Sequence, residues 1–295
     1  MSSQLNTQVS SQAMASSTSI LGRLMTAVPG VITYEIRRAM TPWRMLLWGA
    51  MLVIPVALLI TVATLTRERS IPGDETDFVF SMLLYFLIPE VQTLLGMLLL
   101  ASPIVNSELE SQTWVYSLVR FAGRRSLLLG KYIVAVLWTT TCGICTATIA
   151  IPFLPLQNPL GVWGTLCVLC ILSSLAHGAL FMLIGVLFQK RVMVIAFVYA
   201  IGVEGVLGWI PAVINQFTIA YRLRSILFRW LDLSVSRVTR QQDADQFVRN
   251  GLVADDPSGW TQVGLTFVIT AALLGAALLL VERLQARLDR KSTRL

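Results

Sequence analysis

Charged residues are scarce in this sequence. Asp, Glu, Lys and Arg together make up only 13% of its 295 residues, against roughly 25% in soluble domains. Hydrophobic residues account for 55% of the chain. These proportions exclude an ordinary soluble domain, and they predict a protein that is embedded in a membrane.

Motifs for nucleotide hydrolysis and proteolysis are missing as well. The segment Gly123–Lys131 (GRRSLLLGK) ends like a phosphate-binding loop, but its glycines are too far apart. Tyr132 stands where a Ser or Thr would hold magnesium. The sequence has no HExxH metalloprotease motif and no serine–histidine pair at the spacing of an intramembrane protease. We therefore expect no enzyme activity and no cofactor in this chain.

The four cysteines form two CxxC pairs, Cys142 with Cys145 and Cys167 with Cys170. Two such pairs can make a zinc site. Here, however, both pairs lie inside apolar stretches that predict neighbouring helices, without the turns that zinc ribbons use. Cysteine otherwise behaves as a small buried apolar residue, so we predict no metal site.

Six apolar stretches are long enough to cross the hydrocarbon core of a bilayer, which takes about 20 helical residues. They predict an all-α, polytopic membrane protein. An even number of spans places both termini on one side of the membrane. The predicted spans are Met45–Leu65, Phe78–Val105, Tyr132–Leu154, Trp163–Phe188, Val192–Val213 and Gln262–Val281.

The basic residues indicate which side the termini occupy. Lys and Arg outnumber Asp and Glu by 23 to 16, and they gather at the ends of the apolar stretches. This distribution is typical of topology signals, and it does not predict a nucleic-acid partner. Most basic residues lie in the two termini and in the second and fourth connections, so we predict that both termini are cytosolic. The arginines of the long fifth connection are the exception, because long loops cross the membrane largely regardless of charge.

Polar segments flank the predicted membrane domain. Residues 1–29 are rich in Ser and Gln and lack the basic start of a signal peptide, which predicts a disordered cytosolic tail. Residues 30–285 form the six-span domain, and residues 286–295 form a basic cytosolic tail. At the start of the six-span domain, the sequence Gly30–Thr41 suits a short helix in the headgroup layer, before Pro42 turns the chain inward. A simple continuation of the first span is the alternative.

The fifth connection, about 214–261, is too long for a turn. Its first part spaces Phe217, Tyr221, Arg224 or Ser225, and Phe228 by three and four residues. This spacing is typical of an amphipathic helix that lies at the membrane interface. Its second part, 234–259, is polar.

The second connection has a charged, helix-compatible sequence. Asn106–Lys131 reads NSELESQTWVYSLVRFAGRRSLLLGK and lies between two apolar runs. From Thr113 onward it resembles permease subunits of ABC transporters of the ABC-2 exporter type. In that family an acidic pair, a Thr, a short amphipathic helix, Arg-Pro-x-x-Arg and Leu-Gly-Lys follow one another. Phe121 departs from the pattern, because it stands where the family usually has proline. The matching residues are Glu108, Glu110, Thr113, Arg120, Arg124, Gly130 and Lys131.

A second stretch is similar to the same family. The tight turn Leu187–Arg191 precedes an apolar run that contains Glu204 and then Gly and Pro, as in the fifth span of one branch of these permeases. With the six-span layout, the resemblance covers most of residues 30–285. It implies an elbow helix near 30–41 and helices that partly cap the outer side at 214–261.

The resemblance also implies partners and a location. The segment after the second span would be a cytosolic coupling helix that docks into a separate ATPase subunit, which binds ATP and Mg. Glu108, Glu110, Thr113, Arg120 and Arg124 would form the docking surface. A second copy of the permease, or a relative, would complete the pathway in the cytoplasmic membrane, surrounded by membrane lipid.

Three ionisable residues lie inside the predicted spans: Glu90, His177 and Glu204. Such residues cost roughly 2.5–3.5 kcal/mol on insertion scales, which makes each a candidate for function. Glu90 follows Pro89, which would kink the helix. For the two glutamates, a role in the pathway or its gating and a structural role in helix packing both stay open. For His177 we expect a packing role.

Two further functions stay open besides an exporter permease. A proton-coupled secondary transporter would use Glu90, His177 and Glu204, and it would predict inverted repeats and discontinuous helices. A non-transporting scaffold or assembly factor would instead use the long outer loop as its working surface.

Overall fold

The computed structural model describes residues 29–30, 32–37, 40–67, 73–102, 123–188, 191–210, 215–216, 218–231 and 258–292. Within these ranges every regular element is a helix, and six helical stretches are long and apolar enough to cross a membrane. The prediction of an all-α, polytopic membrane protein is therefore confirmed.

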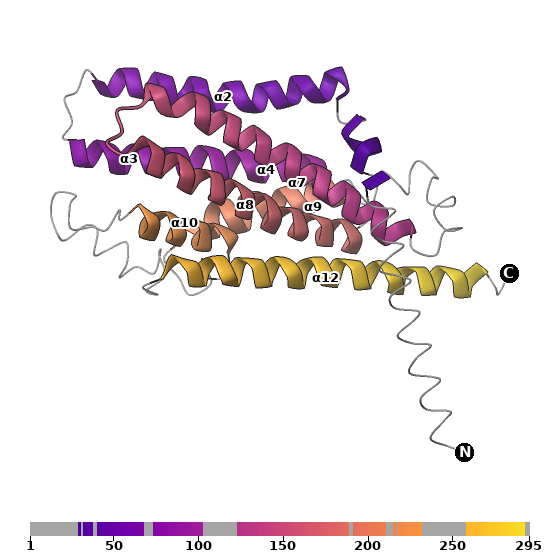
Figure 1. The fold of residues 1–295 in the computed structure, drawn as a ribbon. Helices are drawn as coiled ribbons and strands as arrows, with labels where there is room; N and C mark the ends of the chain where they lie inside the picture. The colour runs from indigo at the N-terminus through magenta and orange to yellow at the C-terminus, as the bar shows by residue number, and fades with distance from the viewer. Residues whose placement is uncertain are drawn as a thin grey trace, which may run out of the picture.

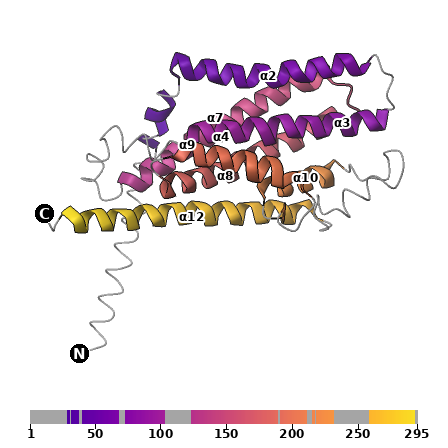
Figure 2. The same ribbon diagram turned by 180° about the vertical axis from the view of Figure 1, so that it is seen from behind.

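The six spans lie side by side in an elongated bundle (Figures 1 and 2). The first is α2 (Pro42–Arg67), and the second is made of α3 (Gly73–Tyr85), η1 (Phe86–Gln92) and α4 (Thr93–Ala101). The third is α7 (Gly123–Ala150), with the short η2 (Ile151–Phe153) at its end, and the fourth is α8 (Pro159–Leu187). The fifth contains α9 (Val192–Tyr199), η3 (Ala200–Val206) and η4 (Leu207–Trp209), and the sixth belongs to α12 (Gly259–Ser292). The predicted spans agree to within five residues with the apolar stretches of these helices that can cross a membrane, except that Val105 and Val213 lie outside the described residues. Helix α7 begins nine residues before the predicted third span, and α12 continues eleven residues beyond the predicted sixth span.

Local sequence explains the start of α8. The Asn158 side chain accepts a hydrogen bond from the Gly161 backbone N–H at 3.1 Å, and Pro159 occupies the first helical position. Asn is a favoured N-cap and Pro suits the first turn, where its missing N–H has no partner to lose. The turn before it is short, so α7 and α8 are antiparallel neighbours.

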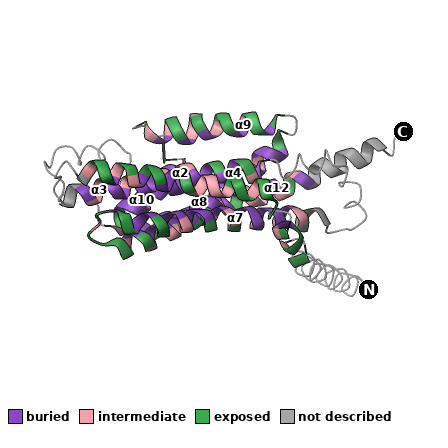
Figure 3. Cartoon of the chain, turned by 90° about the horizontal axis from the view of Figure 1, so that it is seen from above, coloured by how far each residue is buried: buried purple, intermediate pink, exposed green. Residues whose placement is uncertain are grey.

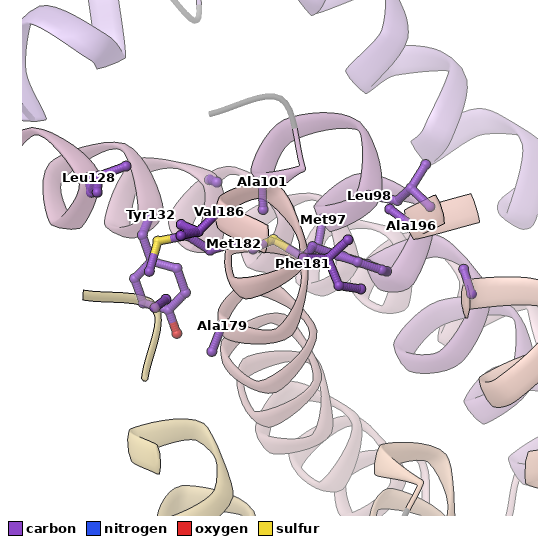
Figure 4. Close-up of a cluster of buried hydrophobic side chains, with 14 of the residues drawn as sticks. Met97, Leu98, Ala101, Leu128, Tyr132, Ala179, Phe181, Met182, Val186 and Ala196 are labelled. Atoms are coloured by element: carbon purple, nitrogen blue, oxygen red, sulfur yellow. The ribbon is translucent and has the colours of Figure 1, made fainter. Parts of the chain in front are cut away.

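The fourth span lies at the centre of the bundle. Helix α8 packs against α4, α7, α10 and α12. One of its clusters, seen in Figure 4, joins Met97 of α4, Tyr132 of α7 and Phe181 of α8, all nearly fully buried. Gly185 lets α8 approach the second span, because a Cβ there would lie 2.9 Å from the Ser102 carbonyl oxygen.

The outer faces of the bundle are apolar. Figure 3 shows exposed residues along the outside of the helices and buried residues between them. The most exposed spans are the first and the sixth, in each of which 17% of the most apolar stretch is buried. Exposed Val53, Leu58, Val268 and Leu279 are among the side chains of these two helices. A lipid environment stabilises such faces, as a spanning helix requires.

A short helix precedes the first span, where the elbow helix is predicted. Residues 32–37 are helical, and the Met40 N–H donates to the Ile36 carbonyl. Glu35 is only 7% exposed, and its Oε1 lies 3.7 Å from Nζ of Lys131 at the start of the third span. The helix is present, and its place in the headgroup layer stays a prediction.

The helix predicted at the start of the fifth connection is present as α10 (Ile219–Trp230). It packs against α8 and α12, and its position relative to the membrane interface stays a prediction. Tyr221, Arg224 and Phe228 are all buried. The bundle supplies partners both for the apolar side chains of α10 and for the cation of Arg224.

Candidate functional site

The second and fifth spans each contain a seven-residue π-helical segment, η1 and η3. Pro89 lies in η1, where its missing N–H disturbs the regular hydrogen-bond ladder. Each segment carries one of the two glutamates that the sequence places inside apolar spans. Glu90 is 4% exposed and Glu204 is fully buried. Single π-helical turns inside α-helices are frequent at functional sites.

Glu204 holds the start of α10 inside the bundle. Its Oε1 accepts the Ile219 N–H at 3.2 Å, and its Oε2 accepts the Ala220 N–H at 3.0 Å. The first N–H groups of a helix have no partner within the helix, and the positive end of the helix dipole favours an anion there. Tyr199 donates its hydroxyl to the same carboxylate at 3.3 Å. Helix α10 therefore starts beside Glu204, among the other spans.

Glu90 is linked to the same region by Trp209 and Arg224. Glu90 Oε1 accepts the Trp209 indole N–H at 2.9 Å, while Oε2 has no hydrogen-bond partner among the described residues. The Arg224 guanidinium lies 4.7 Å from the centre of the Trp209 ring and donates to the Gly208 carbonyl at 2.8 Å. Arg224 is fully buried and within electrostatic reach of Glu90. Buried charges persist only when they are paired and hydrogen-bonded.

His177 joins the second and fifth spans through α8. Its Nδ1 lies 2.9 Å from the Ser173 carbonyl oxygen, and since a carbonyl can only accept, Nδ1 carries a proton. The Ser173 hydroxyl donates to the Pro89 carbonyl at 2.5 Å. On the other side of the ring, Nε2 lies 4.0 Å from Glu204 Oε2, which is too long for a direct hydrogen bond. Polar groups thus run from η1 across α8 to the start of α10.

The structure brings together Glu90, His177 and Glu204, the three ionisable residues predicted to lie inside the spans. It also adds residues that the sequence patterns do not indicate. The spacing of the fifth connection places Arg224 on an interfacial helix, and it gives no reason to select Tyr85. The Tyr85 hydroxyl donates to the Ala220 carbonyl at 2.8 Å, next to the Glu204 cap. One signal could have found Arg224, because glutamates inside apolar spans are stabilised in their ionised form by a nearby cation.

The predicted coupling residues cannot be placed in this cluster. Glu108, Glu110, Thr113 and Arg120 lie outside the described residues. Arg124 belongs to the first turn of α7, but its side chain lies outside the described part of the structure. Their docking role stays a prediction.

None of the four cysteines forms a disulfide; Cys142 and Cys170 are buried, and Cys145 and Cys167 are partly buried. Cys142 Sγ accepts a hydrogen bond from Gln92 Nε2 at 3.1 Å, and Cys170 Sγ lies 2.9 Å from where a Cβ on Gly143 would be. Among the described residues, no group of three or more His, Cys, Asp or Glu side chains could hold a metal ion. These contacts are those of small packing residues.

Comparison with known proteins adds no identification. No protein-family model matches the chain, and no curated protein is significantly similar to it.

Proposed function

We propose that this chain is the membrane-spanning permease subunit of an ATP-binding cassette exporter. It would form the pathway together with a second permease copy or a relative. A separate ATPase subunit, which binds ATP and Mg, would drive it through the connection between the second and third spans. Glu108, Glu110, Thr113, Arg120 and Arg124 would form the docking surface.

The observation that carries this proposal is the position of the charged segment 106–131 in a six-span chain. It joins the second span to the third, as the coupling helix does in the family that the sequence resembles. The ion pair between Glu35 and Lys131 supports the same layout. It ties the short helix before the first span to the helix that the segment leads into. A force applied to this segment would reach both elements.

Glu90, His177, Glu204, Trp209 and Arg224 form a buried polar cluster. This cluster gives the second and fifth spans a shared hinge. Closure of the ATPase dimer would draw the two coupling segments together and tilt these spans, as rigid-body transitions allow. Both spans carry a π-helical segment at the level of the glutamates. Because Glu90 and Glu204 are buried within the chain, we assign them to positioning and gating, and not to contact with the substrate.

Copurification of a partner tests this proposal. The full chain, carrying an affinity tag, should retain an ATP-binding cassette ATPase from its native membrane. Glu108→Lys and Arg124→Glu should reduce the retained ATPase, because charge complementarity sets partner choice and encounter. Arg69→Glu, in the first connection, is the matched control and should retain it. Equal recovery in all variants, or no ATPase in any sample, would contradict the proposal.

One observation favours proton-coupled transport as a second candidate. Two spans are interrupted by π-helical segments, and His177 faces Glu204 at 4.0 Å with Glu90 nearby. Secondary transporters often place their sites at discontinuous helices. Transport that survives ATP depletion, collapses with the proton gradient and is lost in His177→Gln would favour this candidate. Transport that stops on ATP depletion while the proton gradient persists would favour the ATPase-driven permease.

A further inference from the structure

A cavity that opens at the surface of the bundle lies between the first, second and third spans. Residues from α2, η1, α4 and α7 line it, and they include Arg44, Trp48, Gln92, Leu99, Trp138 and Cys142. The mechanism proposed above makes no use of it.

The cavity has a charged end and an apolar wall. Arg44 belongs to the first turn of α2, where the span begins, and is the one charged side chain among its described lining residues. No described acidic residue forms an ion pair with it. Along the wall, the rings of Trp48 and Trp138 lie 6.2 Å apart, and the Trp48 indole N–H donates to the Trp138 carbonyl at 3.4 Å.

The cavity also reaches the outer surface of the bundle. Leu47 and Leu99 line it and are 36% and 41% exposed. At its other end lies Gln92, which is 3% exposed and belongs to the π-helical segment in the middle of the second span. The space therefore extends from the end of the first span toward the middle of the bundle.

We propose that this cavity binds one acyl chain of an anionic phospholipid from the surrounding bilayer, with its phosphate on Arg44. A small soluble anion could bind Arg44 but would leave the apolar wall without a partner. A hydrocarbon chain would bury this wall, which is favourable. Arginine matches phosphate geometry, and the start of a span lies at the depth of the headgroups. The predicted topology places this end in the cytoplasmic leaflet, which is rich in anionic lipids.

Native mass spectrometry of the purified full chain tests this proposal. The protein would be released from nanodiscs that contain phosphatidylcholine and phosphatidylglycerol. Wild type should retain one phosphatidylglycerol per chain in preference to phosphatidylcholine. Arg44→Gln should lower that retention about fivefold, the factor expected from one basic contact near a membrane surface. Leu47→Trp, which fills the mouth of the cavity, should abolish retention of either lipid.

Two controls separate this site from general effects. Arg37→Gln removes a basic charge from the same flank of the first span, outside the cavity, and should bind lipid like wild type. Excess inorganic phosphate should not displace the lipid, because phosphate alone cannot fill the apolar wall. Equal retention in wild type, Arg44→Gln and Leu47→Trp would overturn the proposal, as would equal retention of the two lipids. The measurement needs no ATPase, so its failure would leave the proposed export function standing.

Discussion

The carboxylate of Glu204 accepts the backbone N–H of Ala220 at 3.0 Å, in the middle of the helix bundle. This contact joins the π-helical segment η3 of the fifth span to α10, the helix that follows the span. It places a negative charge at the positive end of a buried helix. Glu204 is therefore one of the residues outside α10 that hold this helix in place.

We predict that Glu204→Gln destabilises the protein by about 1.5–3 kcal/mol, the value of hydrogen bonds to a charged group. The amide can accept from only one of the two N–H groups, and its NH₂ would face a donor. Chemical unfolding of the purified protein, followed by tryptophan fluorescence, measures the change.

Tyr199→Phe provides the control for Glu204. It removes one hydroxyl donor at 3.3 Å from the same carboxylate and leaves both backbone bonds in place. Tyr199→Phe should destabilise the protein less than Glu204→Gln does, because only one long hydrogen bond to the carboxylate is lost. If Glu204→Gln unfolds like wild type, the carboxylate does not hold α10.

Arg224→Met should be among the most destabilising substitutions in the chain. It removes the buried cation that lies within electrostatic reach of the Glu90 carboxylate, and breaking a buried pair costs about 3–5 kcal/mol. Adding Glu90→Gln should restore part of the loss, since one uncompensated charge is then gone. Chemical unfolding, monitored by tryptophan fluorescence, measures the stability of both variants.

Arg222→Met is the matched control for Arg224. Arg222 lies on the same helix but is half-buried, and its bonds to Gln262 and to the Gln216 carbonyl are both 3.3 Å long. Arg222→Met should therefore lower the free energy of unfolding far less than Arg224→Met does. If Arg222→Met and Arg224→Met lower the free energy of unfolding by similar amounts, the charge balance of the buried polar cluster does not cause the loss of stability in Arg224→Met.

Two glycines of α8 should respond in opposite directions to alanine. In Gly185→Ala the new Cβ would lie 2.9 Å from a backbone carbonyl oxygen of Ser102, which cannot move aside easily. Overpacking of this kind costs about 1–3 kcal/mol. Gly164 has no atom within 4 Å of its Cβ position, so Gly164→Ala should gain up to about 1 kcal/mol of helix propensity. If Gly185→Ala is as stable as wild type, the close contact at Gly185 does not constrain the packing of α8.

The pair Glu35 and Lys131 should couple energetically. Their side chains are 9% and 7% exposed, so water screens the pair less than it screens a surface pair, which is worth about 0–1 kcal/mol. A double-mutant cycle with Glu35→Gln and Lys131→Gln should give a coupling energy of about 1 kcal/mol or more. The cycle of Glu35→Gln with Arg37→Gln, on the same short helix, should give almost none. A coupling near zero in the first cycle would mean that the two elements are not tied by this pair.

The spans could be predicted from the sequence because length and apolarity fix them locally. The six predicted stretches match the six helical stretches of the structure that can cross a membrane. The choice of Glu90, His177 and Glu204 also followed from local rules, since ionisable residues in apolar spans are costly.

The arrangement around these residues could not be predicted in the same way. The three- and four-residue spacing of Tyr221, Arg224 and Phe228 indicates an amphipathic helix, and it does not distinguish an interface from a buried polar cluster. That choice depends on partners distant in sequence, such as Glu204 and Trp209. The π-helical segments are tertiary features too, for which the proline of the second span gave only a partial signal.

The most direct test of the ATPase-driven permease is photo-crosslinking from the second connection in intact cells. A photoreactive amino acid at position 117, between Thr113 and Arg120, would be activated in cells that express the full chain. We predict a crosslink to a nucleotide-binding cytosolic subunit, which is lost in Glu108→Lys. The same photoreactive amino acid at position 69, in the first connection, should give no such crosslink. Labelling of position 117 by a membrane-impermeant reagent from outside, or transport by the purified chain alone, would contradict the account.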